Sequence, residues 1–285
     1  RALPNLADNI KCGNSLIGTN VKTVEETIRT TKEGQLSLYA GPFAGLLDLT
    51  SLMVEVVERS DATVSDVHSS AEGFGQFRKM LEPYKEVLDL WTSQYFDNKR
   101  AREFITLFGD QVLPALKGEM KIAKEYKEAI AKSRERAKEK RFFHWDLEFP
   151  EIFVDLHKRN WKQNPGFDAV IGNPPYIRAE NADKEQRNYL LESNTYKTLY
   201  GRFDIFAAFA ESGISIAKQN GWYGIIIPRS FLTINYCEPL RKFILSKLHL
   251  AKLVDFGDEQ VFEGVGITCC IPIIQKKPPN GDSLT

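Results

Sequence analysis

The stretch that most constrains the fold is 167–176, which reads Phe-Asp-Ala-Val-Ile-Gly-Asn-Pro-Pro-Tyr. Its first half has the apolar and β-branched residues of a buried strand, and Gly172 predicts the end of that strand. The two prolines that follow have fixed φ angles and no amide hydrogens, so the chain must turn stiffly. Asn173 precedes a proline, which favours an extended backbone there. The sequence therefore predicts a rigid turn that presents carbonyls, a carboxamide and an aromatic ring at a strand end.

The chain after this turn alternates between helical and strand patterns. Helices are expected from Phe203 to Ala217, with Asn220-Gly221 as the stop signal, and from Glu238 to Leu248. Strands are expected in three apolar runs: Trp222–Ile227, Leu253–Phe256 and Ile267–Ile274. The alternation predicts an α/β fold with a mostly parallel sheet and helices on both faces. Ligands of such sheets bind beyond the carboxyl ends of the strands, where the turn lies.

The region before residue 142 has a helical rather than an alternating sequence pattern. Apolar residues recur at helical spacing in three stretches: Leu46–Val57, Phe74–Trp91 and Ala101–Phe108. The stretch from Lys117 to Arg141 is rich in Lys, Arg, Glu and Ala, and it is net basic. A solvated helix is the favoured interpretation of that stretch, and a phosphate-contacting surface is the alternative.

Overall charge and cysteine content give no support for nucleic-acid binding or for a metal site. Lys and Arg number 38, as do Asp and Glu, so nucleic-acid binding cannot be argued from net charge. None of the four cysteines forms a Cys-x-x-Cys pair, and Cys269-Cys270 lies in an apolar run, which indicates buried thiols rather than a metal site. The sequence has no signal peptide and no apolar run of membrane-spanning length, so we expect a cytoplasmic protein.

The predicted turn suits a planar group that carries an amine. In the exocyclic amine of adenine the nitrogen lone pair is delocalised into the ring, so the nitrogen is a poor nucleophile. Acceptors for its two hydrogens favour a tetrahedral nitrogen, and the Asn173 side-chain oxygen and the Pro174 carbonyl are two such acceptors. Stacking on Tyr176 contributes about 1–3 kcal/mol, which offsets much of the cost of flipping the base out of a duplex.

These residues resemble motif IV of the amino-methyltransferases that use S-adenosylmethionine, in the adenine-specific form Asn-Pro-Pro-Tyr at 173–176. The surrounding chain resembles the large, type IIG-like DNA adenine methyltransferases of bacterial restriction-modification systems. Asn9–Leu16 is similar to the segment of motif III, Asp204–Pro228 to motifs V and VI, and Asp255–Ile274 to motifs VII and VIII. His144–Phe153 is similar to a segment that precedes motif IV.

The resemblance implies a partial Rossmann-like class I methyltransferase sheet with a large helical insertion. Residues 1–20 would carry the motif III part of the methyltransferase core, residues 21–141 the helical insertion, and residues 142–285 the rest of the core. The methyl donor would be S-adenosylmethionine, and the substrate a flipped adenine at a specific sequence in double-stranded DNA. No metal and no membrane partner is expected.

The resemblance also assigns roles to single residues. Asn173, Pro174 and Tyr176 would hold and activate the adenine, and Phe262 would sandwich the base from the other side. Asn14 and Asn173 would contact S-adenosylmethionine.

One departure from the family pattern sets a limit. The glycine-rich motif I belongs before Arg1, and the sequence-reading domain belongs after motif VIII. We therefore expect a fragment whose partners include the missing N-terminal and C-terminal regions of the parent chain, and which is inactive by itself.

Two other functions stay open. Asn-Pro-Pro-Tyr also occurs in enzymes that resemble protein-glutamine methyltransferases, where an amide nitrogen takes the place of the base amine. A catalytically silent DNA-binding or specificity module would fit the absence of motif I, but such a module has no need of the turn at 173–176.

Overall fold

The computed structural model describes residues 9–31, 42–43, 45–57, 64–262 and 266–279. The chain divides into two compact units, Arg1–Lys162 and Gln163–Thr285, and each is described by itself. The division thus falls after Lys162, whereas the sequence placed the end of the helical insertion at residue 141. Residues 1–8 of the first predicted segment lie outside the described part, and the assignment of 1–20 and 142–285 to one core stays a prediction.

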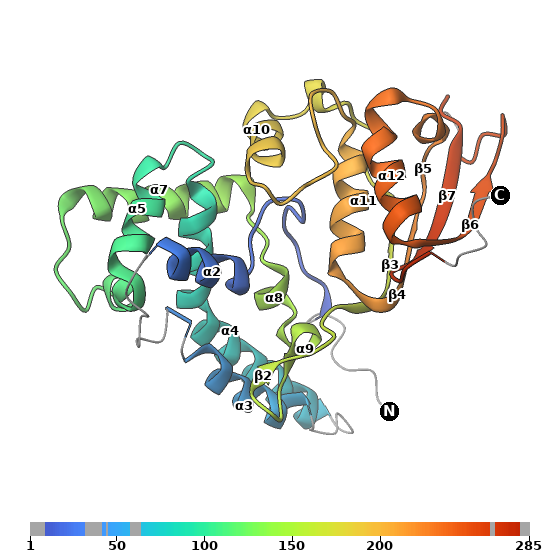
Figure 1. Cartoon of the computed structure of the whole chain (residues 1–285). Coiled ribbons are helices and arrows are strands. Elements are labelled where there is room, and N and C mark those ends of the chain that lie inside the picture. The colour runs from blue at the N-terminus through green and yellow to red at the C-terminus, as the bar shows by residue number, and fades with distance from the viewer. Residues whose placement is uncertain (1–8, 32–41, 44, 58–63, 263–265, 280–285) are drawn as a thin grey trace. The chain divides into compact units, whose positions relative to one another are not determined.

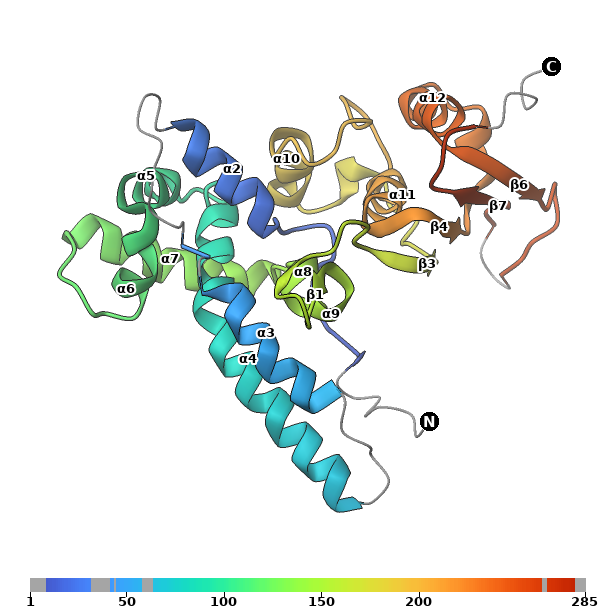
Figure 2. The ribbon, with the colours of Figure 1, turned by 60° about the horizontal axis from the view of Figure 1, so that its bottom comes forward.

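The first unit is helical between Val21 and Lys140 in its described residues, as the spacing of apolar residues predicts. Its helices are α2 (Val21–Thr31), α3 (Leu46–Val57), α4 (Val64–Ser93), α5 (Lys99–Phe108), the 3-10 turn η1 (Gly109–Gln111), α6 (Val112–Leu116) and α7 (Lys124–Lys140). Helices α3 and α4 lie side by side (Figure 2). The unit ends in α8 (Trp145–Glu148), α9 (Pro150–Phe153) and a short antiparallel pair, β1 (Val154–Asp155) and β2 (Asn160–Trp161).

Apolar side chains from these helices share one core. Val87, Leu88 and Leu90 of α4 are fully buried in it, together with Phe104 and Ile105 of α5. Each fully buried side chain of this size contributes roughly 1.5–3 kcal/mol relative to leaving it exposed. The core therefore explains why α4 and α5 are helical at the spacing seen in the sequence.

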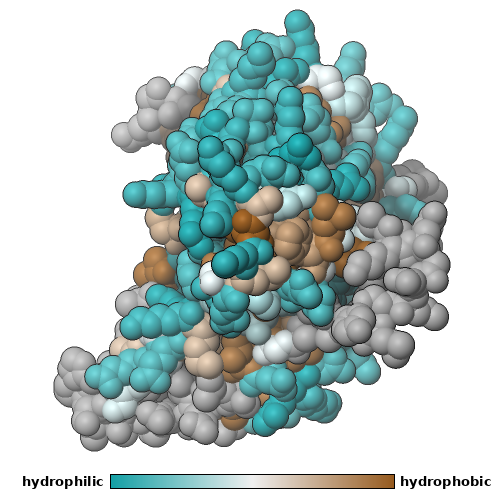
Figure 3. Space-filling view, turned by 90° about the vertical axis from the view of Figure 1, so that its left-hand side faces the viewer, coloured by the Kyte–Doolittle hydropathy of each residue, from teal (hydrophilic) through white to brown (hydrophobic). Residues whose placement is uncertain are grey.

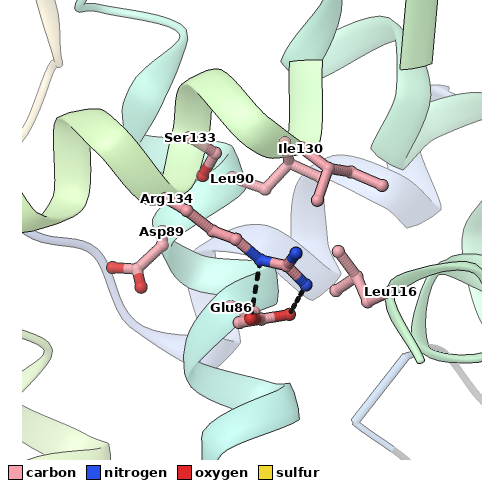
Figure 4. A pocket seen from close by; sticks show the side chains of 7 residues that line it. All are labelled: Glu86, Asp89, Leu90, Leu116, Ile130, Ser133 and Arg134. Carbon is pink, nitrogen blue, oxygen red and sulfur yellow. Dashed lines mark hydrogen bonds and ion pairs between the residues drawn. The ribbon is translucent and has the colours of Figure 1, made fainter. Parts of the chain in front are cut away.

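The basic stretch before residue 142 is largely neutralised by neighbouring carboxylates. In α7, Arg134 makes two parallel hydrogen bonds to Glu86 of α4, of 2.9 and 3.0 Å, at the edge of a small pocket (Figure 4). Lys132 pairs with Asp97, and other cations of α7 pair within the helix. The side of the molecule in Figure 3 is mainly hydrophilic around a smaller apolar area. These contacts favour the solvated-helix interpretation of α7.

The second unit has the predicted α/β composition. Its strands are β3 (Phe167–Gly172), β4 (Ala217–Ile225), β5 (Ile227–Pro228), β6 (His249–Asp255) and β7 (Cys269–Gln275). Its helices are α10 (Lys184–Glu192), α11 (Ile205–Ile216) and α12 (Glu238–Lys247), with 3-10 turns η2 (Ala179–Asn181), η3 (Arg229–Leu232) and η4 (Asn235–Cys237). The α/β fold class is therefore confirmed, as are strands at each predicted position.

The direction of the strands agrees with the prediction of a mostly parallel sheet except at β7. Strands β3 and β4 pair in parallel, while β7 pairs antiparallel with β4, β5 and β6. Strands β3, β4, β5 and β6 therefore all run in one direction, and β7 runs in the opposite one. Helices α10 and α11 lie between β3 and β4, which permits a parallel crossover, whereas the described residues between β6 and β7 contain no helix, and β7 returns antiparallel.

The helices of this unit also deviate from the prediction. The apolar side chains of α11 and α12 form one cluster with Tyr223, Ile225 and Ile274, so both helices cover the same face of the sheet (Figure 1). Trp222 alternates with Tyr223 in β4 and is 43% exposed on the opposite face. Helices on both faces are thus not found in the described part of this unit.

The predicted stop signal Asn220-Gly221 lies inside β4 rather than at the end of a helix. Helix α11 ends at Ile216, and β4 begins at Ala217. Asn220 has a left-handed backbone (φ 66°), and the register against β3 shifts between Phe167 and Ala169. The Asn-Gly pair therefore makes a bulge in the strand, which is a common use of such residues.

Candidate active site

The stretch 173–176 directly follows the carboxyl end of β3, as predicted, but it continues as an irregular segment that forms neither the predicted turn nor a bend. The carbonyl of Gly172 accepts a hydrogen bond from Ile226 N (3.1 Å), which is the last contact of this strand with its parallel neighbour. Asn173 and Pro175 are exposed and Pro174 is buried. Because proline has no amide hydrogen, the chain cannot extend the ladder and leaves the sheet at this point. The exposed Asn173 carboxamide thus lies at a sheet edge where ligands of α/β proteins bind.

Tyr176 is fixed through its hydroxyl group. The hydroxyl donates to the Ile226 carbonyl oxygen (3.3 Å) and lies 3.7 Å from Cys269 Sγ. Burial, helped by the Cys269 contact, raises the pKa of Tyr176 above its ordinary value, so the hydroxyl stays a donor. Since the hydroxyl is engaged with the break between β4 and β5, a ligand would meet the face or edge of the ring.

The chain after Tyr176 is held against the start of α11. Ala179 N donates to Phe203 O (3.0 Å), and Ile205 N donates to Ile177 O (2.9 Å). Asp204 precedes α11 but makes no side-chain bond to its first turn; its carboxylate accepts from the Tyr236 hydroxyl at 2.7 Å. Asp204 thus ties the segment after Tyr176 to η4.

A buried carboxylate fixes the next loop. Glu211 of α11 is 9% exposed and accepts hydrogen bonds from Lys197 N, from Thr198 N (3.0 Å) and from the Thr198 hydroxyl (2.6 Å). The acidic residue in an otherwise apolar helix was the only sequence signal for this role. The sequence offered no signal for Tyr236, Ile226 or Cys269, which contact the site from 32 to 93 residues away.

The two remaining predicted residues are Phe262 and Asn14. Phe262 is half-buried in the connection between β6 and β7. Asn14 lies in the first unit, where its side-chain oxygen accepts from Leu16 N (3.3 Å) and its backbone N donates to Arg141 O (2.7 Å). The structure therefore describes Asn173, Pro174 and Tyr176 together, and Asn14 in a separate unit. The roles of all five stay predictions.

Three of the four cysteines are buried. Cys237, Cys269 and Cys270 are buried and Cys12 is exposed, and all four are free, so the prediction that Cys269 and Cys270 are buried thiols is confirmed. Burial raises the pKa of Cys270 to about 11. Within the described residues no three His, Cys, Asp or Glu side chains cluster as metal ligands. The same part of the chain contains no helix with the length and apolarity to cross a membrane.

The small pocket in Figure 4 belongs to the first unit and is separate from the predicted site. It is lined by Glu86, Asp89, Leu90, Leu116, Ile130, Ser133 and Arg134. None of the predicted site residues lines it. The pocket lies between α4, α6 and α7 and is a packing feature of the helical region.

Known proteins match this chain over long stretches. Residues 47–262, more than half of the chain, match the Eco57I restriction-modification methylase family. RM.Eco57I of Escherichia coli, a type II restriction enzyme and methyltransferase, is 34% identical over 115 residues, which are 40% of this chain and 12% of that protein. RM.MjaORFECS2P of Methanocaldococcus jannaschii, inferred to be a protein of the same kind, is 28% identical over 318 aligned residues, or 99% of this chain and 23% of that protein.

Shorter relatives give the same result. The type II methyltransferase M.HincII of Haemophilus influenzae is 32% identical over 108 residues, which are 38% of this chain and 22% of that protein. The chain thus spans less than a quarter of the length of these three curated relatives. The matched range includes residues 173–176, the Tyr176 partner Ile226 and Phe262, and it extends through most of the helical region. The chain belongs to the Eco57I restriction-modification methylase family.

Proposed function

We propose that the protein acts in methyl transfer from S-adenosylmethionine to the exocyclic amine of adenine at a specific sequence in double-stranded DNA, within a restriction-modification system. The observation that carries the proposal is the exposed Asn173, in the proline-containing segment that follows the carboxyl end of β3 and includes Tyr176. Membership in the Eco57I family supports the same reaction class.

Residues 173–176 have chemically distinct tasks in this proposal. The Asn173 side-chain oxygen and the Pro174 carbonyl accept the two hydrogens of the adenine amine, so that its nitrogen becomes tetrahedral and nucleophilic. Methyl transfer would form the nitrogen–methyl bond as the sulfonium carbon–sulfur bond breaks and S-adenosylhomocysteine leaves, and the amine nitrogen would release one proton to solvent. Tyr176, oriented by its bond to Ile226, stacks on the flipped base, and Phe262 covers the other face.

The residues assigned to the methyl donor fit its chemistry. S-adenosylmethionine supplies an electrophilic methyl group on a sulfonium. Asn14 offers a carboxamide, which has the donor and acceptor pattern that pairs with the edge of an adenine ring. Its conformation is set by the bond from Leu16 N to its side-chain oxygen. Asn173 would touch the donor on the side of the methyl group.

The proposal is tested by methyl transfer from radiolabelled S-adenosylmethionine to unmethylated duplex DNA, using the full-length parent protein. Asn173→Ala should abolish transfer and leave the fold intact, because Asn173 is exposed. Asn235→Ala is the matched control, since Asn235 is also an exposed asparagine of the second unit, and it should retain full activity. Full activity of the Asn173→Ala protein would overturn the mechanism.

Further arms of the same assay separate the finer points. A DNA without adenine at the target and a glutamine-containing protein substrate test the specificity for the adenine amine. The 285-residue chain alone is expected to transfer methyl groups poorly or not at all. A cytoplasmic location, where the DNA substrate lies, completes the proposal.

A further inference from the structure

Two stretches far apart in the sequence run side by side in the first unit. Residues 13–21 and 141–146 form what we call the seam. Asn14 N donates to Arg141 O (2.7 Å), Phe143 N donates to Ile17 O (2.8 Å), and Asn14 bridges Phe142 in parallel. The indole N–H of Trp145 reaches Ser15 O at 3.3 Å. The loop that carries Asn14 is therefore held along its length by the segment after α7.

The approach of the two stretches depends on two glycines. A Cβ atom on Gly18 would lie 1.9 Å from the carbonyl oxygen of Phe143, and one on Gly13 would lie 2.4 Å from the Phe143 ring. Neither glycine has a positive φ, so the requirement is steric closeness rather than backbone conformation. Phe143 is thus packed directly on both ends of the Asn14 loop.

The far end of the seam is closed by buried polar groups. His144, which is fully buried, accepts from Thr19 N through Nδ1 (3.0 Å) and donates from Nε2 to Asp89 Oδ1 (3.0 Å). Asp146, 5% exposed, accepts from Val21 N through Oδ2 (2.7 Å). Its other oxygen, Oδ1, is buried with no hydrogen-bond partner in the described structure.

Burying these polar groups costs free energy that an apolar core would not. A buried carboxylate with one unpaired oxygen costs free energy, and well-packed apolar side chains of similar volume are often as stable or more so. Phe142, Phe143, Leu16 and Ile17 are buried, yet among the described residues they are not part of the helical core cluster. The seam therefore fixes a loop conformation more than it contributes to the helical core.

From these contacts we infer that Phe143, His144 and Asp146 are positioning residues, which hold the Asn14 loop in the shape that binds the adenosine part of the methyl donor. The inference rests on the proposed function, because it takes Asn14 as a donor contact. It gives a task to the aromatic and acidic segment at 142–150, which the proposed reaction does not use directly.

Donor binding measured by calorimetry, with S-adenosylmethionine and the full-length parent protein, tests the inference. Asp146→Ala removes the acceptor of Val21 N and should weaken donor binding about tenfold, the effect of one lost buried hydrogen bond. Asp146→Asn keeps an acceptor and should restore most of the affinity. In kinetics the loss should raise KM for the donor and leave kcat at saturating donor unchanged. Gly75→Ala is the control, since no atom lies within 4 Å of its added Cβ.

A measurement on the unaltered protein makes the test independent of how the variants fold. Amide hydrogen exchange should slow together in residues 14–21 and 141–146 when S-adenosylmethionine is added. Slowing in 14–21 alone, or unchanged donor binding in a folded Asp146→Ala protein, would overturn the inference. If Asn14→Ala still weakens donor binding in that case, the proposed function stands without the seam. If the unaltered protein binds no donor, the proposed function fails as well.

Discussion

The buried Asp146 carboxyl makes the stability of the first unit depend on pH. Burial raises the pKa of Asp146 from 3.8 to about 6, against the bond from Val21 N and the neighbouring His144, which both lower it. A folded pKa above the unfolded value means that the carboxyl contributes stability fully below pH 3.8, and that this contribution is lost as the pH rises through about 6. At about 1.4 kcal/mol per pH unit, the loss amounts to about 3 kcal/mol.

The substitution Asp146→Asn isolates this effect, because the amide oxygen can still accept from Val21 N and does not titrate. Unfolding in urea, followed by tryptophan fluorescence, reports mainly on the first unit, since Trp91, Trp145 and Trp161 lie there. Between pH 7 and pH 4 the wild-type protein should gain about 3 kcal/mol on the variant, and above pH 7 their difference should be constant. The reasoning would be refuted if the difference in unfolding free energy did not change with pH, or if the wild-type protein became less stable relative to the variant as the pH falls.

Two further predictions concern the second unit. Tyr176→Ala should weaken binding of target DNA at least tenfold in fluorescence anisotropy, while the affinity for the methyl donor stays within about twofold. Tyr176→Phe should lower the DNA affinity only about a few-fold, because it keeps the ring and loses only the bond to Ile226. Equal losses of affinity for DNA and donor would count against stacking. Glu211→Ala should lower the free energy of unfolding by about 3 kcal/mol in urea, because it leaves the amide of Thr198 without its acceptor. Glu192→Ala, at an exposed position, should change it by less than about 0.5 kcal/mol, and similar effects of the two would contradict the proposed anchoring.

Local signals in the sequence predicted the local features of the site. The β-branched run before Gly172 predicts β3, and the glycine and the two prolines predict the end of that strand. The 3.6-residue spacing of apolar residues predicts the helices of the first unit. In each case the signal and the structure it specifies lie within the same ten to thirty residues.

The features that could not be predicted depend on contacts across the chain. Strand β7 runs antiparallel to its neighbours, and the described residues between β6 and β7 contain no helix, which apolar runs do not reveal. An Asn-Gly pair such as Asn220-Gly221 can end a helix or form a bulge in a strand. Only the pairing of β4 with β3 decides between these two structures. The bond from Tyr176 to Ile226 joins residues 50 apart, so no pattern of spacing points to it.

The central claim is that residues 173–176 hold the amine of adenine for methylation. The most direct test is nucleoside analysis by mass spectrometry of duplex DNA incubated with S-adenosylmethionine and the full-length parent protein, or with its Asn173→Ala variant. The account predicts N6-methyladenine with the parent protein and none with Asn173→Ala, while Asn235→Ala matches the parent. Methylation on another base, or equal N6-methyladenine from the Asn173→Ala protein, would contradict it.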